Sequence, residues 1–209
     1  MEEYISVSRP SCTEITEKKS KFIANIAHAE TEQAAEAFIA GVKKEHYNAT
    51  HNVFAYRLFD GAKKYSDDGE PAKTAGYPIL ELLEKERICD TVCVVTRYFG
   101  GTLLGVGGLI RAYTRAAKEG LLKSGVSQKT LCQVLQISVD YTCFDQLMHI
   151  LKASRHQVLQ TEYLEAVTLT VVLELETADA LAETLSDAFF GAVRIEKKEQ
   201  IYFDLEGDV

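Results

Sequence analysis

The chain has 209 residues, of which 46% are hydrophobic, 26% are charged and three are proline, and its formal net charge is -8. This composition excludes collagen, disordered tails and low-complexity scaffolds, and the length suits one large domain or two modest ones. No apolar run approaches the ~18 residues that cross a bilayer, and the acidic start Met1-Glu2-Glu3 lacks a signal peptide's apolar region, so we expect a cytoplasmic protein with no membrane partner.

The first half of the chain combines strand and helix patterns. Alternating apolar residues predict a strand at 22–26, and Thr31 can cap a helix with Ala35, Phe38 and Val42 on one face. The elements expected after it are a strand at 52–58, a polar loop at 60–74, a helix at 78–87, an apolar strand at 91–96, a glycine-rich turn and a helix at 109–123. Together they predict one mixed α/β domain over residues 1–125.

The charge balance changes near residue 125. Residues 1–128 hold equal numbers of acidic and basic side chains, whereas residues 129–209 hold 14 acidic and 6 basic ones. The small, polar stretch 125–129 therefore predicts a linker. The elements expected beyond it are a strand at 135–139, a helix at 144–151, strands at 158–163 and 167–175, a helix capped by Thr177 and a strand at 193–203. This βαββαβ order predicts a ferredoxin-like domain over residues 130–209, and the whole chain is expected to be α+β.

The segment from Arg97 to Arg111 places five glycines between an apolar strand and a helix. Such glycines let backbone amides approach a ligand closely, and a helix N-terminus favours anions. The helix also carries Arg111 and Arg115 in a basic stripe, and a bound phosphate or carboxylate would explain cations at that end of a helix. The anion, nucleic-acid or partner site predicted from this segment comprises Arg97, Tyr98, Gly100, Gly101, Gly105, Gly107, Gly108, Arg111 and Arg115.

Two interpretations of this segment remain open. Tyr98 or Phe99 could stack on bases beside the phosphate contacts. Alternatively, the glycines only allow a tightly packed turn and the arginines are a solvated face. The spacing matches neither the dinucleotide-binding glycine fingerprint nor the phosphate loop of nucleotide hydrolases, so both of those enzyme classes are disfavoured.

A second cluster, Ser66 to Pro71, contains three carboxylates within four residues. Asp67, Asp68 and Glu70 could hold Mg²⁺ or share acid and base roles. The preferred interpretation is a turn in which Asp67 or Asp68 accepts hydrogen bonds from backbone amides. The five histidines and five cysteines lack metal-binding spacing, so we predict no metal site, no cofactor and no catalytic residue.

These segments together resemble the YigZ/IMPACT family, in particular its two-domain bacterial members. The matching motifs are Ser66–Pro71 with Thr74-Ala75-Gly76 and Pro78–Leu80, then Arg97–Gly101 with Leu104-Gly105, Gly107–Leu109 and Arg111–Tyr113, and also His51-Asn52 and Ser20-Lys21-Phe22. The resemblance covers residues 20 to 121 and identifies as family signature positions Asp67, Asp68, Gly69, Glu70, Thr74, His51 and Asn52. Lys73 and Leu103 depart from the residues that members often carry there, a small residue and a lysine.

The resemblance implies an N-terminal domain like the second domain of a small-subunit ribosomal protein and domain IV of elongation factor G. It implies a C-terminal domain similar to domain V of that factor. Eukaryotic relatives regulate translation by competing for an activator of the starvation-responsive initiation-factor kinase. We therefore expect a non-catalytic, translation-associated regulator that binds RNA, the ribosome or a translation-related protein through its N-terminal domain, with no DNA specificity.

Two other functions remain as alternatives. One is a Mg²⁺-dependent enzyme acting on a phosphorylated small molecule or nucleotide. The other is a protein-interaction module that contacts no phosphate. Because the second domain is acidic and would repel nucleic acid, any RNA contact is expected on the first.

Overall fold

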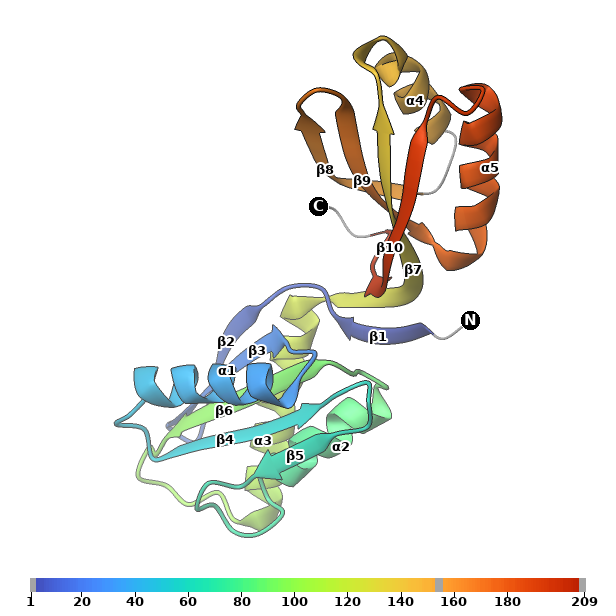
Figure 1. Ribbon diagram of the computed structural model, residues 1–209. Coiled ribbons are helices and arrows are strands. Elements are labelled where there is room, and N and C mark those ends of the chain that lie inside the picture. Colours follow the sequence, from blue (N-terminus) through green and yellow to red (C-terminus); the bar gives the residue numbers. More distant parts are fainter. Residues whose placement is uncertain (1–2, 153–155, 207–209) are drawn as a thin grey trace. The chain divides into compact units, whose positions relative to one another are not determined.

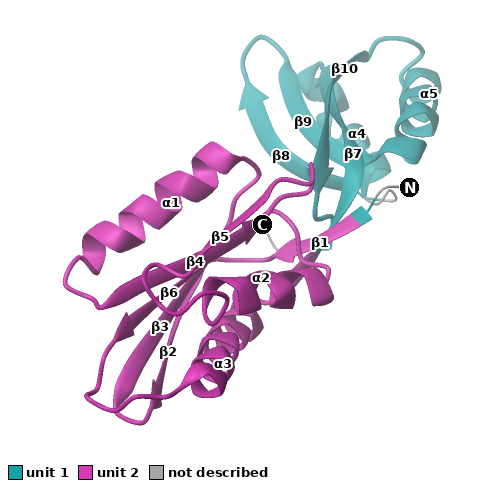
Figure 2. Ribbon diagram, turned by 90° about the horizontal axis from the view of Figure 1, so that it is seen from below, with its two compact units in different colours: residues 1–3, 128–209 teal, residues 4–127 magenta. Residues whose placement is uncertain are grey.

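The computed structural model describes residues 3–152 and 156–206, and the chain divides into two compact units. Residues 4–127 form the N-terminal unit, and residues 1–3 and 128–209 form the C-terminal unit (magenta and teal in Figure 2). Both units combine helices with an antiparallel sheet, so the chain is α+β. No helix in the described part of the chain is long and apolar enough to span a membrane.

The N-terminal unit is built on a five-stranded antiparallel sheet in the order β2-β3-β6-β4-β5. Its strands are β2 (Ser11–Glu17), β3 (Ser20–His28), β4 (His51–Arg57), β5 (Lys63–Ser66) and β6 (Thr91–Tyr98), and β1 (Glu3–Val7) precedes them. Strand β6 lies in the middle of the sheet with both faces covered. Its side chains are therefore buried from Thr91 to Arg97, which explains its continuous apolar run.

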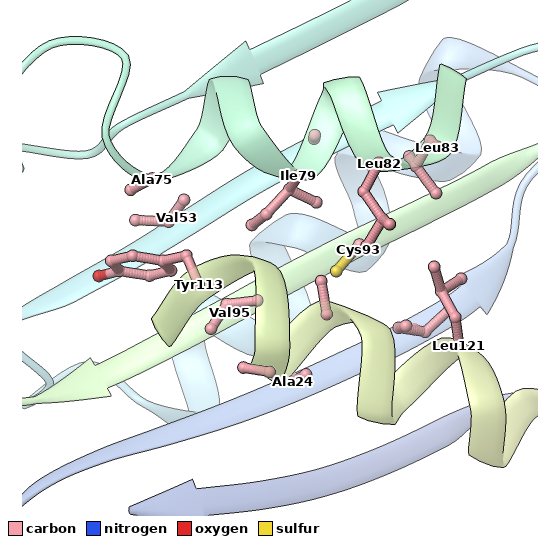
Figure 3. Packing of buried hydrophobic residues seen from close by; sticks show 14 of the residues in the cluster. Ala24, Val53, Ala75, Ile79, Leu82, Leu83, Cys93, Val95, Tyr113 and Leu121 are labelled. Carbon is pink, nitrogen blue, oxygen red and sulfur yellow. The ribbon is translucent and has the colours of Figure 1, made fainter. Parts of the chain in front are cut away.

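Three helices cover the two faces of this sheet (Figure 1). Helix α1 (Glu32–Glu45) packs on one face, and Thr31 caps it by accepting a hydrogen bond from the backbone of Ala34 at 3.1 Å. Helices α2 (Gly76–Lys85) and α3 (Val106–Ser124) pack on the opposite face. Figure 3 shows Ile79 of α2 and Tyr113 of α3 beside Val53 and Val95 of the strands.

Two edge strands differ from the sequence-based expectation. The expected polar loop at 60–74 contains β5, and β2 had not been expected at all. Each pairs with a neighbour on one side only and carries lysines or acidic residues, so the apolar alternation that identifies a strand is weak there. Helices α2 and α3 begin at Gly76 and Val106, two and three residues earlier than expected.

The C-terminal unit has the observed order βαββαβ. Its elements are β7 (Val126–Val139), α4 (Phe144–Leu151), β8 (His156–Tyr163), β9 (Val167–Glu174), α5 (Ala178–Ala188) and β10 (Arg194–Phe203). The antiparallel strands lie in the order β10-β7-β9-β8, with Leu135, Leu147 and Leu185 in the core.

Two local expectations for this region need correction. Residues 126–129 are the first residues of β7 rather than an irregular linker. The hydroxyl of Thr177 donates to the carbonyl of Glu174 at 2.9 Å, so its side chain does not cap α5.

The buried thiol of Cys93 in β6 predicts a loss of stability at alkaline pH. Burial raises the pKa of Cys93 to about 12, whereas the thiol of the unfolded chain ionises near its ordinary value of 9. The contribution of this thiol to the free energy of unfolding is therefore fully present below pH 9. It is lost as the pH rises toward 12, by about 1.4 kcal/mol per pH unit. We expect urea unfolding between pH 8 and 11 to show a shallower pH dependence for Cys93→Ala than for the unchanged chain. Equal slopes would contradict this assignment.

Candidate functional site

The carboxylate of Asp67 organises the loop between β5 and α2. Its Oδ1 accepts hydrogen bonds from the backbone amides of Ala75 at 3.0 Å and Gly76 at 2.8 Å, and its Oδ2 accepts one from Lys73 at 2.7 Å. Gly76 is the first residue of α2, and the residue before it is an alanine with no side-chain acceptor. Asp67 therefore caps α2 from upstream, which is the turn role preferred on sequence grounds.

Asp68 ties the same loop to the start of β4. Its Oδ2 accepts from the backbone amide of Asn52 at 2.6 Å, and its Oδ1 accepts from Lys43 Nζ at 3.3 Å. The carbonyl of Asp68 lies 2.7 Å from His51 Nδ1, and because a carbonyl only accepts, that nitrogen carries a proton. The side chain of Asn52 continues the network by accepting from the hydroxyl of Thr96 at 2.7 Å.

Glu70 is the centre of a buried polar network. Its Oε1 accepts hydrogen bonds from Arg97 Nη1 at 2.6 Å and from the hydroxyl of Tyr113 at 2.7 Å, and it lies 3.8 Å from His51 Nε2. The side chains of Arg97 and Glu70 are only 5% and 4% exposed, so the pair is desolvated. Burial, and secondarily the charge of Glu70, raise the pKa of Tyr113, which therefore keeps its proton. The network joins the loop to β6 and α3.

This geometry gives Arg97 a different role from the phosphate contact expected of it. Its guanidinium pairs with Glu70, donates a long hydrogen bond to Ser20 at 3.4 Å and lies between the rings of Phe22 and Phe99, 5.4 and 5.5 Å from their centres. A side chain enclosed in this way positions the loop and does not reach solvent. The burial of Arg97 could not be predicted from its neighbours in the sequence, because its partner Glu70 lies 27 residues away in the chain.

The other signature residues are structural in this arrangement. Thr74 donates to the carbonyl of Pro71 at 2.6 Å, and Gly69 adopts φ 88° beside the His51 ring. The hydroxyl of Tyr98 donates to Asn48 at 3.2 Å and lies 3.0 Å from His46 Nδ1. The seven signature positions and Arg97 thus form one cluster. As expected, the acidic segment forms a turn in which Asp67 accepts hydrogen bonds from backbone amides. Within residues 3–152 and 156–206, no group of three His, Cys, Asp or Glu side chains is arranged around a possible metal position.

The glycine-rich turn packs against the turn between β2 and β3. A Cβ at Gly100 would overlap the carbonyl group of Lys19 and the amide nitrogen of Ser20, so glycine is required there by close approach. Gly101 and Gly105 have positive φ, and Gly107 and Gly108 lie in the first turn of α3. Phe99, in the same turn, remains 46% exposed.

The exposed arginines line a surface pocket of about 220 Å³. Its wall is formed by α3 and by the end of β2, and its lining residues are Glu17, Lys18, Leu104, Gly108, Arg111, Ala112 and Arg115. The predicted site residues thus do not form one site. Arg97 and the signature positions belong to the buried cluster around Glu70, whereas Gly108, Arg111 and Arg115 line this basic pocket. Tyr98 and the other glycines belong to neither group. Lys18 was not among the predicted site residues, although the run Lys18-Lys19-Ser20-Lys21 is a sequence signal that points to it.

Comparisons with known proteins give consistent results over both units. The profile of the Impact N-terminal domain matches residues 18–121, and that of a domain of unknown function, DUF1949, matches residues 137–192. The IMPACT family member YvyE of Bacillus subtilis (strain 168) is 40% identical over 203 residues, covering 96% of this chain and 94% of that protein. The IMPACT family member YigZ of Escherichia coli (strain K12) is 31% identical over 199 residues, covering 93% and 98%. A crystal structure described as that of a hypothetical protein is 30% identical, with a TM-score of 0.63, and covers 95% of this chain and 98% of its own.

Proposed function

The chain belongs to the IMPACT family, and from this premise we propose that it is a non-catalytic, cytoplasmic regulator of translation that binds RNA, free or within the ribosome, through its N-terminal unit. The family resemblance implies that this unit is like ribosomal and elongation-factor domains, and this expectation supports the assignment. We also assign the βαββαβ unit to the ferredoxin-like folds, on the strand order β10-β7-β9-β8. Fold similarity by itself does not specify a ligand, so the proposal depends on the charged surface.

The observation that carries the proposal is that two arginines, unpaired within the described part of the chain, lie together on one face of α3 and line one pocket. Several lysines of the N-terminal unit have carboxylate partners, in the pairs Lys21–Glu14, Lys43–Asp68, Lys63–Glu84 and Lys64–Glu36. Among the described residues, Arg111 and Arg115 have neither an ion pair nor a hydrogen bond, and both are exposed on one face of α3. Cations left without protein partners are available to neutralise the phosphates of a polyanion.

The carboxylate geometry weighs against the Mg²⁺-dependent enzyme. A hard cation needs several free oxygen ligands. The carboxylate of Asp67 already accepts three backbone hydrogen bonds, that of Asp68 is held by Asn52 and Lys43, and that of Glu70 by Arg97 and Tyr113. These contacts hold the loop and cap α2, and in the described part of the chain the three carboxylates do not converge on one metal position.

Replacing Arg111 and Arg115 together by alanine is expected to weaken RNA binding. Purified protein should sediment with ribosomes and with bulk RNA at about 50 mM salt and much less at about 200 mM, because phosphate contacts release counterions. Loss of two contacts should reduce the slope of log affinity against log salt by roughly 1.4 for single-stranded RNA.

The matched control is Lys63→Ala with Lys64→Ala, which removes the same charge from the same unit but at two lysines paired with Glu84 and Glu36. It should leave sedimentation unchanged. If the arginine variant also sediments like the unchanged protein, the RNA proposal is wrong. Sedimentation that does not depend on salt would indicate a protein partner instead.

A further inference from the structure

We propose that the pocket between the β2–β3 turn and α3 holds one phosphate group, contacted jointly by Lys18, Arg111 and Arg115. This inference rests on the proposed function and deepens it, because it assigns one backbone phosphate of RNA to a particular site. A phosphate monoester of a small molecule offers the same chemistry, and the experiment below separates the two sources. Lys18 is the residue that this inference adds to the binding surface.

The lining of the pocket is cationic and uncompensated. Three of its side chains are basic and one, Glu17, is acidic, so the lining carries a net positive charge. In the described part of the chain, none of Lys18, Arg111 and Arg115 has an ion pair or a hydrogen bond. Arginine presents a planar fork of donors that matches phosphate oxygens, and lysine adds a point charge. Three such groups around one concavity suit a phosphate oxyanion.

The size of the pocket favours a single group over a whole small molecule. A volume of about 220 Å³ is below the roughly 300–1,000 Å³ of pockets that enclose a drug-sized ligand. It is large enough for a phosphate with part of its sugar. Leu104 and Ala112 form an apolar part of the wall, which limits water on that side and strengthens the charge interaction.

The β2–β3 turn is not explained by backbone preference. Glu17 pairs with Ser20, so Lys18 and Lys19 are the two residues of the hairpin turn, and both have positive φ, 45° and 69°. Turns of this kind favour Asn-Gly, because left-handed backbone is strained for side chains such as lysine. Strain that persists at such a position points to a functional demand, here a positive charge at the mouth of the pocket.

The same turn is held firmly in place. The backbone of Gly100 lies against Lys19 and Ser20 so closely that a Cβ would not fit, and its amide donates to the hydroxyl of Ser20 at 3.1 Å. The turn that carries Lys18 is thereby fixed to the glycine-rich turn that leads into α3. The backbone positions from which Lys18 and Arg111 extend are therefore held close together, which removes part of the entropic cost of binding there.

Two substitutions of opposite sign test the pocket. Lys18→Asn removes the charge and suits the left-handed backbone, so this variant should melt at or above the temperature of the unchanged protein. It should weaken binding of a labelled single-stranded RNA roughly fivefold at fixed low salt. Glu17→Gln removes the acidic group from the lining and should tighten binding by roughly two- to threefold.

The controls make the same charge changes elsewhere in the N-terminal unit. Lys44→Ala in α1 and Glu86→Gln after α2 alter exposed residues outside the pocket, and both should bind RNA within about twofold of the unchanged protein. Fluorescence anisotropy gives the affinities. Thermal melting with added inorganic phosphate or adenosine monophosphate gives the response to small phosphates, since a ligand that binds only the folded state raises the melting temperature.

The outcomes separate the pocket from the proposed function. If RNA binds and depends on Arg111 and Arg115, but Lys18→Asn and Glu17→Gln behave like their controls, the pocket assignment is overturned and the function stands. If RNA does not bind but a small phosphate raises the melting temperature, and Lys18→Asn abolishes that rise, the proposed function fails and the pocket is a small-phosphate site. If Lys18→Asn changes neither the RNA affinity nor the rise in melting temperature with small phosphates, the pocket proposal is wrong.

Discussion

Replacing Glu70 by alanine is expected to lower the free energy of unfolding by about 3–5 kcal/mol. The carboxylate of Glu70 neutralises Arg97 and accepts the hydroxyl of Tyr113, and both pairs are buried. Removing it leaves a guanidinium charge enclosed without a partner and orphans the tyrosine hydroxyl, so most of the cost is the desolvation of groups that remain. Urea unfolding followed by circular dichroism measures the change.

Two further variants check the cause of this effect. Glu86→Ala removes an exposed carboxylate of the same unit and should change stability by no more than about 0.5 kcal/mol. Adding Arg97→Met to Glu70→Ala removes the stranded charge, so the double variant should be more stable than Glu70→Ala alone. A double variant that is less stable by the full sum of the two single effects would contradict a charge-pair explanation.

Replacing Gly100 by alanine is expected to cost about 3 kcal/mol and to reduce RNA affinity. The added Cβ would overlap the backbone of Lys19 and Ser20, and neither backbone can move without separating the glycine-rich turn from the β2–β3 turn. The displacement would also move Lys18 away from Arg111, so binding should fall even in the molecules that remain folded. Urea unfolding and RNA anisotropy on the same preparation measure both effects.

Gly41→Ala is the matched control for this substitution. Gly41 lies in the interior of α1, and a Cβ there meets nothing within 4 Å. Alanine should therefore stabilise the protein by about 0.5–1 kcal/mol and leave RNA affinity unchanged. Similar losses at both positions would mean that the close approach at Gly100 is not the cause.

A helix or strand could be predicted where the apolar pattern of its own residues shows which face it buries. The buried strand β6 and the βαββαβ order of the C-terminal unit could be predicted, because apolar periodicity within each segment reflects the faces it buries. The edge strands β2 and β5 could not, because each pairs on one side only and its charged side chains resemble a loop.

The candidate site was predictable in composition but not in arrangement. The glycine-rich and acidic segments identified the family, and the comparisons confirm that membership. The turn role of the acidic segment followed from Asp-Gly chemistry, which depends on neighbours in the chain. The pocket formed by Lys18 with Arg111 and Arg115 did not follow, because the β2–β3 turn and α3 are far apart in the sequence.

By itself, the sequence determined the family, the order of most elements and the presence of several arginines near a glycine-rich turn. Only the tertiary structure decided which of those arginines are available to a ligand. Arg97 is neutralised by Glu70 inside the unit, whereas Arg111 and Arg115 face solvent beside Lys18. Local patterns specify which residues are present and which face of a strand or helix they occupy. Burial and ion pairing depend on distances between segments, and those distances exist only once the chain has folded.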